Sequence, residues 1–509
     1  MPPPFTEPGL ELHTPEDIGI VADGREGWLS RAPFALRRER VRMRSRRSPM
    51  PTTPRHFSRL GLSLRALLAL AILLSVHDAL ATQASAAVKA LVGGRLIDGY
   101  GGAPLADSVV VIEGETIVAV GRQGEVAIPA GAEVISTEGM DVLPGLWDSH
   151  VHLMIVGHSD YDHWDKTYPP LFRSTIMPAA AKQLLLAGVT SARELGAPLD
   201  DILAIRDAIN AGRLPGPTLY VSGPFLQHEP YPGTEAFRWG IKGPADARAK
   251  VKRLADAGVD LIKLIDQDQM TLDEVKAVVD EAHARKLPVV AHSHRPDEIR
   301  RGIAAGVDDF EHTGLATAPE YPADIVELLR ARAAAPGATP LYWTPTVAPL
   351  FLYGQTRDNP ERIDDPRWHE GLPAEVVADI RQSLAHVDRL EYFAMATRRV
   401  PFVPRKFQQL RESGVTMLVG TDSGIPLTFH TDSTWREIDT WVRVLGVPAM
   451  DAIRAATYWP AKMMKVDGKV GTVSEGKVAD VIAVRGDVLA RPDVLSDVAI
   501  VIKRGVRYK

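Results

Sequence analysis

The sequence of 509 residues contains no cysteine, which excludes disulfide bonds, thiolate metal ligands and a cysteine nucleophile. Any metal ion in this protein must therefore be held by imidazole, carboxylate or a less usual ligand. The formal net charge is only −5, which gives no reason to expect a nucleic acid partner. Hydrophobic residues make up 45% and charged residues 24% of the chain, which is ordinary for a globular protein.

Long apolar runs are scarce, and the clearest one near the start of the chain, residues 66–76, is too short to span a bilayer comfortably. Eight arginines lie in residues 31–47 before it, and Ala84-Ser85-Ala86 follows it. A basic segment, an apolar core and a small-residue exit together are typical of a secretory signal peptide.

We therefore predict that residues 1–86 are an N-terminal extension and signal peptide. The mature protein would be exported, to the periplasm or as a secreted protein, with no stable membrane anchor after cleavage. Met1, Met43 and Met50 all stay open as the true start of translation.

Short apolar alternations broken by glycine occupy both ends of the remaining chain. They run from Val88 to Val142 and return from Gly471 to Val506, a pattern typical of short strands joined by tight turns. The sequence predicts a small β-sandwich domain built from both chain ends, with residues 87–144 as its first part and residues 458–509 as its second.

Between these ends, strand patterns alternate with helical patterns. The strand patterns cover residues 146–153, 189–193, 218–222, 259–265, 287–292, 307–312, 341–346 and 415–422. Eight strands mostly separated by helices predict an α/β fold in which residues 145–457 form a (β/α)8 TIM barrel. The stretch at about 348–400 is predicted to be a helical insertion after the seventh strand.

The first predicted strand carries two histidines, His150 and His152. Since side chains two residues apart on a strand share one face, both imidazoles can serve one divalent transition metal. A pair of surface histidines is the alternative. Other metal-capable side chains also stand at predicted strand ends, namely Lys263, His292, His294, His312 and Asp422. Such a histidine-rich set with one carboxylate suits Zn²⁺ or a similar ion.

Lys263 lies within the apolar run Leu261–Ile265. Burial there disfavours the ammonium form and lowers the pKa of the lysine, which leaves a neutral amine that can add CO2. A buried ion pair between Lys263 and either Asp422 or Glu311 is the alternative interpretation.

The chain resembles the amidohydrolase superfamily, near its imidazolonepropionase-like and Xaa-Pro dipeptidase branch. The resemblance extends from Val88 to Lys509. Its motifs are Gly145–His152, Ala187–Thr190, Leu261–Leu264, Ala291–His294, Glu311–Thr313, Gly420–Ser423, Ala455–Thr457 and Gly471–Asp480. Together these motifs are highly specific, whereas each one alone is weak.

The resemblance implies that His150 and His152 bind the more buried metal ion, which the Asp422 carboxylate also contacts. It further implies that Asp422 takes a proton from the attacking water and later delivers it to the leaving group. A carboxylate beside a metal-activated water is a suitable general base.

The resemblance also assigns the second half of the site. Lys263 stands where this branch has a lysine carbamylated by CO2, so that the new carboxylate bridges two metal ions. His292 and His312 would bind the second ion.

These roles imply a hydrolase acting on carbon–nitrogen bonds, with two divalent metal ions, best suited to Zn²⁺, and CO2 bound as a carbamate on Lys263. We expect it to cleave an amide or peptide bond in a small substrate such as a dipeptide or an N-acyl amino acid. The alternatives are hydrolysis of a lactone, cyclic amide or phosphotriester at the same site, or a deaminase, which has no need of Lys263. A binding protein that has lost activity is a further alternative, which the complete ligand set disfavours.

Signals for substrate binding are weaker. The candidate contacts are His294, Tyr231, Arg238 and Tyr342, of which Tyr231 or Arg238 can hold a carboxylate or an oxyanion. Arg193 and Glu194 are predicted to form a structural pair, while Asp308, Asp309 and Glu311 are predicted to be solvated or packing partners. The only expected binding partner is the small-molecule substrate. The sequence leaves open whether the protein forms a homo-oligomer.

Overall fold

The computed structural model describes residues 88–314, 318–337 and 339–509. The predicted N-terminal extension and signal peptide, residues 1–86, lie outside this part of the chain. Within the described residues, no helix has the length and apolar character needed to cross a membrane.

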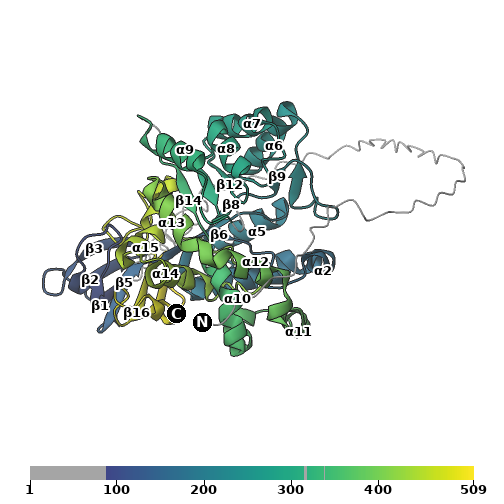
Figure 1. The fold of residues 1–509 in the computed structure, drawn as a ribbon. Coiled ribbons are helices and arrows are strands. Elements are labelled where there is room, and N and C mark those ends of the chain that lie inside the picture. The colour runs from purple at the N-terminus through teal and green to yellow at the C-terminus, as the bar shows by residue number, and fades with distance from the viewer. Residues whose placement is uncertain (1–87, 315–317, 338) are drawn as a thin grey trace, which may run out of the picture. The chain divides into compact units, whose positions relative to one another are not determined.

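The first sheet combines strands from the beginning and the end of the described chain. Its strands are β1 (Val88–Leu96), β2 (Leu105–Glu113), β3 (Thr116–Arg122), β4 (Glu133–Ser136), β5 (Met140–Pro144), β16 (Val481–Arg485), β17 (Val498–Lys503) and β18 (Val506–Arg507). Antiparallel pairing of β5 with β16, with Leu143 opposite Ile482, joins the two ends, and Figure 1 shows β16 beside β5. All of these described strands belong to one hydrogen-bonded sheet. The β-sandwich, which requires two packed sheets, therefore stays a prediction.

The other described strands form two parallel sheets. The smaller sheet holds β6 (Leu146–Val151), β7 (Val189–Glu194) and β8 (Thr218–Val221). The larger one runs in the order β10 (Arg238–Gly240), β9 (Phe225–Gln227), β11 (Ile262–Leu264), β12 (Val289–His292), β13 (Asp309–Glu311), β14 (Tyr342–Thr344) and β15 (Thr416–Met417).

Each of the eight predicted central strands contains an observed strand, which confirms those eight predictions. The sequence predicts no strand in residues 223–243, between the third and fourth predicted strands, yet β9 and β10 pair there in parallel. Three-residue strands are too short to produce a recognisable alternation of apolar and polar residues.

Backbone hydrogen bonds link the two parallel sheets at both edges of the smaller one. The Asp260 N–H donates to Val221 O over 2.9 Å, and the Ser149 N–H donates to Val419 O over 2.9 Å. Val151 also forms a parallel bridge with Ser423. The carboxyl ends of strands from both sheets therefore meet on one side of the molecule.

Helices follow most of the parallel strands. They are α2 (Tyr161–Thr167), α3 (Pro169–Leu171), η1 (Phe172–Ile176), α4 (Met177–Leu186), α5 (Leu199–Asn210), α6 (Pro244–Ala257), α7 (Leu272–Ala284), α8 (Pro296–Ala305) and α9 (Ala323–Ala334). A capping box begins α7: the Thr271 side chain accepts from the Glu274 N–H, and the Glu274 side chain accepts from the Thr271 N–H.

The predicted insertion after the seventh strand is helical. It contains α10 (Ala348–Asp358), η2 (Pro360–Asp364), η3 (Pro366–His369), α11 (Ala374–Ser383), η4 (Val387–Arg389), α12 (Glu391–Arg399) and η5 (Val400–Phe402). Its first turn is fixed by buried Glu437, which accepts hydrogen bonds from the N–H groups of Val347 (3.0 Å) and Ala348 (2.6 Å). This carboxylate satisfies N–H groups that a helix start leaves unpaired.

Four further helices and one 3-10 segment complete the described chain. They are α13 (Val403–Glu412), α14 (Ser433–Arg443), α15 (Ala449–Ala455), α16 (Tyr458–Met463) and η6 (Pro492–Asp497).

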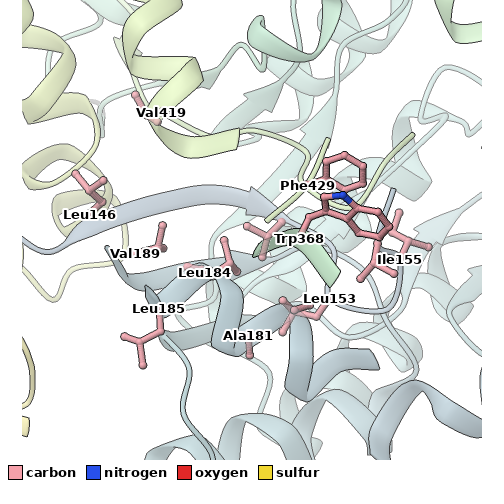
Figure 2. Close-up of a cluster of buried hydrophobic side chains, with 14 of the residues drawn as sticks. Leu146, Leu153, Ile155, Ala181, Leu184, Leu185, Val189, Trp368, Val419 and Phe429 are labelled. Carbon is pink, nitrogen blue, oxygen red and sulfur yellow. The ribbon is translucent and has the colours of Figure 1, made fainter. Parts of the chain in front are cut away.

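The largest apolar cluster joins the smaller parallel sheet to α4 and to the insertion (Figure 2). Leu146 and Val189 belong to the sheet, and Leu184 belongs to α4. Trp368 of η3 stacks on Phe429, with ring centroids 4.6 Å apart. The insertion is therefore packed into the main core.

Candidate metal centre and active site

His150, His152 and Asp422 converge where strands from the two parallel sheets end. The His150 and His152 Nε2 atoms are 3.2 Å apart, and they lie 3.3 Å and 3.2 Å from Asp422 Oδ1. Ligand atoms on one tetrahedral zinc ion lie about 3.3 Å apart, because each is about 2.0 Å from the metal. The three atoms therefore have the spacing of a metal-binding triad.

The other ring nitrogen of His150 faces a buried charge network. His150 Nδ1 donates to Glu311 Oε2 over 2.8 Å, which leaves Nε2 with its lone pair directed at the triad. Arg193 lies 3.1 Å from Glu311 and 2.7 Å from Asp309, and all three of these side chains are fully buried. The predicted Arg193–Glu194 pair is therefore wrong. For Glu311 the solvated alternative is wrong, whereas its prediction as a packing partner is confirmed.

Asp148 fixes β6 against the segment that carries Asp422. Its carboxylate accepts hydrogen bonds from the Thr421 hydroxyl (2.7 Å), the Thr434 hydroxyl (2.8 Å) and the His150 N–H (3.1 Å). Burial raises the pKa of Asp148 to about 6, although these donors oppose the rise. This carboxylate therefore holds two of the triad residues in register.

A second group of imidazoles lies beside the triad. The ligand atoms of His292, His294 and His312 lie within 4.8 Å of one another, and His312 also groups with His150 and Asp422. His312 Nδ1 is 2.8 Å from the Thr346 hydroxyl, while its Nε2 is buried without a hydrogen-bond partner. One imidazole thus stands between the two groups.

Burial keeps these imidazoles neutral. It lowers the pKa values of His150, His292 and His312 well below the ordinary value, and that of His294 to about 4. Only a neutral imidazole can donate a lone pair to a metal ion. The pKa of Asp422 moves the opposite way: burial raises it, but His150 and His152 outweigh that effect and hold it well below its usual range.

Lys263 is fully buried, and its Nζ has no hydrogen-bond partner among the described residues. The ion pair with Asp422 or Glu311 is therefore wrong, since neither contact forms. Burial lowers the pKa of Lys263 to about 8, although Glu311 and Asp422 oppose the shift. An unpartnered amine in this state fits the chemistry of a lysine that adds CO2.

Three residues at this site adopt left-handed backbone conformations. The φ angles are +76° for His312, +45° for Thr346 and +57° for Asp422. Such conformations cost roughly 1–3 kcal/mol each in non-glycine residues and persist where the surroundings enforce them. Two of the strained residues, His312 and Asp422, are predicted metal ligands, and the third, Thr346, contacts His312 through its hydroxyl group.

A cavity of about 710 Å³ opens over these residues, which is within the usual range for small-molecule sites. Its lining includes His152, His292, His294, His312, Thr346 and Asp422.

Of the predicted substrate contacts, Tyr231, Arg238 and His294 line this cavity. The Arg238 guanidinium lies 4.5 Å from the centre of the Tyr231 ring. Tyr342 instead packs with Leu261 and other apolar residues and is not among the lining residues. The reason is its position at the start of β14, whereas the cavity lies at the carboxyl ends of the strands.

Several cavity residues were missed by sequence reasoning. Tyr161 and Asp165 come from α2, while Tyr353, Tyr392 and Arg399 come from the insertion. Tyr161 and Asp165 are one helical turn apart, so their side chains share one face of α2. Recognising α2 as a helix from the sequence would have indicated that the two residues face the same side. The insertion residues belong to no motif and offered no such signal.

The amidohydrolase family model matches residues 142–365 and 375–507. Ochratoxinase from Aspergillus niger is 25% identical over 448 residues, which cover 79% of this chain and 82% of the relative. The crystal structure of A. niger ochratoxinase superposes with a TM-score of 0.62 at 25% identity, covering 84% of this chain and 96% of that one.

A Bifidobacterium longum protein assigned as a prolidase has a solved structure with a TM-score of 0.65 at 26% identity. That likeness covers 84% of this chain and 95% of the other. A Xaa-Pro dipeptidase with bound methionine has a TM-score of 0.64 at 24% identity, covering 83% of this chain and 100% of the other, which is a likeness of fold alone.

Proposed function

Because the chain belongs to the amidohydrolase family, we propose that it is a metal-dependent hydrolase that cleaves an amide or peptide bond of a small substrate. The observation that carries this proposal is the triad of His150, His152 and Asp422, whose three ligand atoms lie within 3.3 Å of one another. The similarity to ochratoxinase and to a protein assigned as a prolidase supports the carbon–nitrogen bond as the one cleaved.

The proposal includes the closed barrel. The Asp260–Val221 and Ser149–Val419 hydrogen bonds support the two parallel sheets as one (β/α)8 barrel with the cavity at its carboxyl-terminal face. The strands from both chain ends would then form the accompanying β-sandwich domain.

The residues present fit two divalent metal ions, with Zn²⁺ as the expected metal. His150, His152 and Asp422 would hold the first ion, and His292 and His312 the second, with a carbamate on Lys263 between them. The buried, unpartnered His312 Nε2 and Lys263 Nζ support this assignment, because buried polar atoms without partners are rare unless a ligand satisfies them. His294, which borders the same group, would face the substrate.

When bound, such ions lower the pKa of a water molecule and polarise the substrate carbonyl. Asp422 is the proton carrier: its carboxylate accepts a proton from the attacking water as the C–O bond forms and returns it to the nitrogen as the C–N bond breaks. Its low pKa keeps the carboxylate ionised, which is the form that can accept a proton. Glu311 and Asp148 hold His150 and Asp422 in position without touching the substrate.

The cavity favours a substrate with an apolar body and a negative charge. Tyr161, Tyr353 and Tyr392 supply aromatic surface, while Arg238 and Arg399 supply guanidinium groups. The Nε atoms of both arginines are buried without a hydrogen-bond partner. A carboxylate would satisfy them, which supports an N-acyl amino acid or a dipeptide over a neutral lactone.

Metal removal tests the proposed function. Purified protein is expected to carry about two divalent ions per chain at this site and to hydrolyse at least one N-acyl amino acid or dipeptide in a panel that also contains lactones. Dialysis against a chelator should abolish this activity, and added Zn²⁺ should restore it. Metal-free protein with full activity would contradict the proposal, and His150→Ala is expected to be inactive.

Replacing Arg238 with methionine tests the charge preference. We expect KM for a carboxylate-bearing substrate to rise roughly 10- to 100-fold, because a hydrogen bond to a charged group contributes about 1.5–3 kcal/mol. KM for the same substrate with its carboxylate amidated should change far less. Arg253→Met is the matched control, since Arg253 also lies over an aromatic ring, that of Trp239, at 4.4 Å but does not line the cavity. Equal effects on both substrates would refute a carboxylate contact.

A further inference from the structure

A second cluster of metal-capable side chains lies where the segment around α2 meets α11 of the insertion. His158 precedes α2, His163 belongs to α2, and Asp379 belongs to α11. One ligand atom from each lies within 4.8 Å of the other two. His163 Nε2 is 2.8 Å from Asp379 Oδ2, and His158 Nε2 is 3.6 Å from the same oxygen. We propose that these three side chains bind a divalent transition-metal ion, with Zn²⁺ as the best match, that clamps α2 to the insertion.

The burial and the unpaired ring nitrogen of His158 are the main evidence that this cluster binds a metal ion. Its side chain is only 3% exposed, and its Nε2 has no hydrogen-bond partner. The other ring nitrogen, Nδ1, lies 3.0 Å from both the carbonyl oxygen and the backbone N of Asp160. These contacts permit two tautomers, and the one in which Nδ1–H donates to the carbonyl leaves a lone pair on Nε2, toward His163 and Asp379. Metal-ligating histidines adopt this tautomer, so a bound ion would select it.

The other two side chains are also oriented by neighbours. The Tyr168 hydroxyl donates to Asp379 Oδ2 over 2.7 Å, and the Thr167 hydroxyl lies 3.5 Å from His163 Nδ1. Partners of this kind fix the ligands of metal sites. A hydrogen bond between His163 and Asp379 alone explains two of the three residues, but it leaves the buried His158 Nε2 unsatisfied.

The donor set indicates the metal. Two imidazoles and one carboxylate form a three-ligand zinc set that leaves the fourth position to water. The His163 side chain is 44% exposed, so solvent reaches this side of the cluster. Calcium and magnesium prefer all-oxygen sites and do not match two imidazoles.

An ion here would join two segments that both line the main cavity. Next to the cluster, the Ser159 hydroxyl donates to Ser383 O over 2.7 Å, so the two segments already touch. Tyr161 on the α2 side and Tyr392 on the insertion side line the cavity. The clamp would therefore fix the distance between two walls of the substrate site while lying outside its lining.

Zinc binding by wild type and by Asp379→Asn tests the proposal. The asparagine keeps the size of the side chain and an oxygen for the Tyr168 hydroxyl, but it loses the ligand charge. After equilibration with ZnCl2 and gel filtration, we expect the variant to carry about one zinc ion fewer per chain than wild type. Glu375→Gln, an exposed residue of α11, is the matched control and should keep the wild-type zinc content.

Amide hydrogen exchange locates the ion independently of the central site. In wild type and in Glu375→Gln, ZnCl2 should slow exchange in peptides covering residues 158–168 and 374–384, and in Asp379→Asn it should not. His158→Gln should behave like Asp379→Asn. Equal zinc content in wild type and Asp379→Asn, or identical slowing of exchange in both, would overturn the proposal.

Discussion

The substitution Asp422→Asn is expected to lower kcat by roughly 100- to 10,000-fold, the range found for general acid–base catalysis. The amide keeps the shape of the carboxylate and an oxygen that can contact a metal ion, but it cannot accept a proton. His150 and His152 are unchanged and lie 3.3 Å and 3.2 Å from Asp422 Oδ1. We therefore expect the variant to retain most of its metal. Metal content and kcat should be measured on the same preparation.

A matched control separates this effect from the removal of any buried carboxylate. Asp480 is also buried, and burial raises its pKa to about 6. It accepts a hydrogen bond from the Arg504 N–H and lies outside the cavity lining. Asp480→Asn is expected to keep kcat near that of wild type. If Asp422→Asn kept full turnover with full metal content, Asp422 would not be the proton carrier.

The substitution Lys263→Ala is expected to lower the metal content by about one ion per chain, with a loss of activity of at least roughly 100-fold. The physical reason is that the carbamate would supply a bridging carboxylate, which the alanine side chain cannot form. Elemental analysis and hydrolysis of the best substrate provide the two measurements. An active variant that still carries both ions would refute the bridge.

Lys503→Ala provides the comparison for Lys263. Lys503 is 4% exposed, and burial lowers its pKa to about 8, as for Lys263. It belongs to β17, outside the cavity lining, so its loss should leave metal content and kcat unchanged. Incubation of wild type with 13C-bicarbonate and Zn²⁺ should also give a carbamate carbon signal by NMR that Lys263→Ala lacks. A wild-type spectrum without that signal would argue against carbamylation.

The sequence predicts the position of a candidate metal ligand where that residue lies in, or directly after, a recognisable strand. His150 and His152 share a face because strand side chains alternate, and the structure brings both to Asp422, some 270 positions away in the chain, at 3.3 Å and 3.2 Å. His292 and His312 likewise follow from strands that end at the same edge. Local patterns suffice here because parallel strands bring their carboxyl ends together.

Two predictions about side-chain contacts in the barrel region were wrong. Arg193 and Glu194 are neighbours in sequence, yet neighbours on a strand point to opposite faces. Arg193 therefore pairs with Asp309 and Glu311 instead. Tyr342 was assigned to the substrate, but its place at the start of β14 puts it among Leu261 and its apolar neighbours.

The eight predicted strands, the helical nature of the insertion and a candidate ligand set rich in histidine and free of cysteine could all be derived from the sequence alone. These features follow from periodicity and residue type, which are local properties. The wall that each cavity residue occupies depends on the tertiary fold, because the insertion contributes Tyr353, Tyr392 and Arg399 through packing that no motif records. The same holds for His158, His163 and Asp379: a ligand cluster that joins α2 to α11 exists only once the two helices are docked.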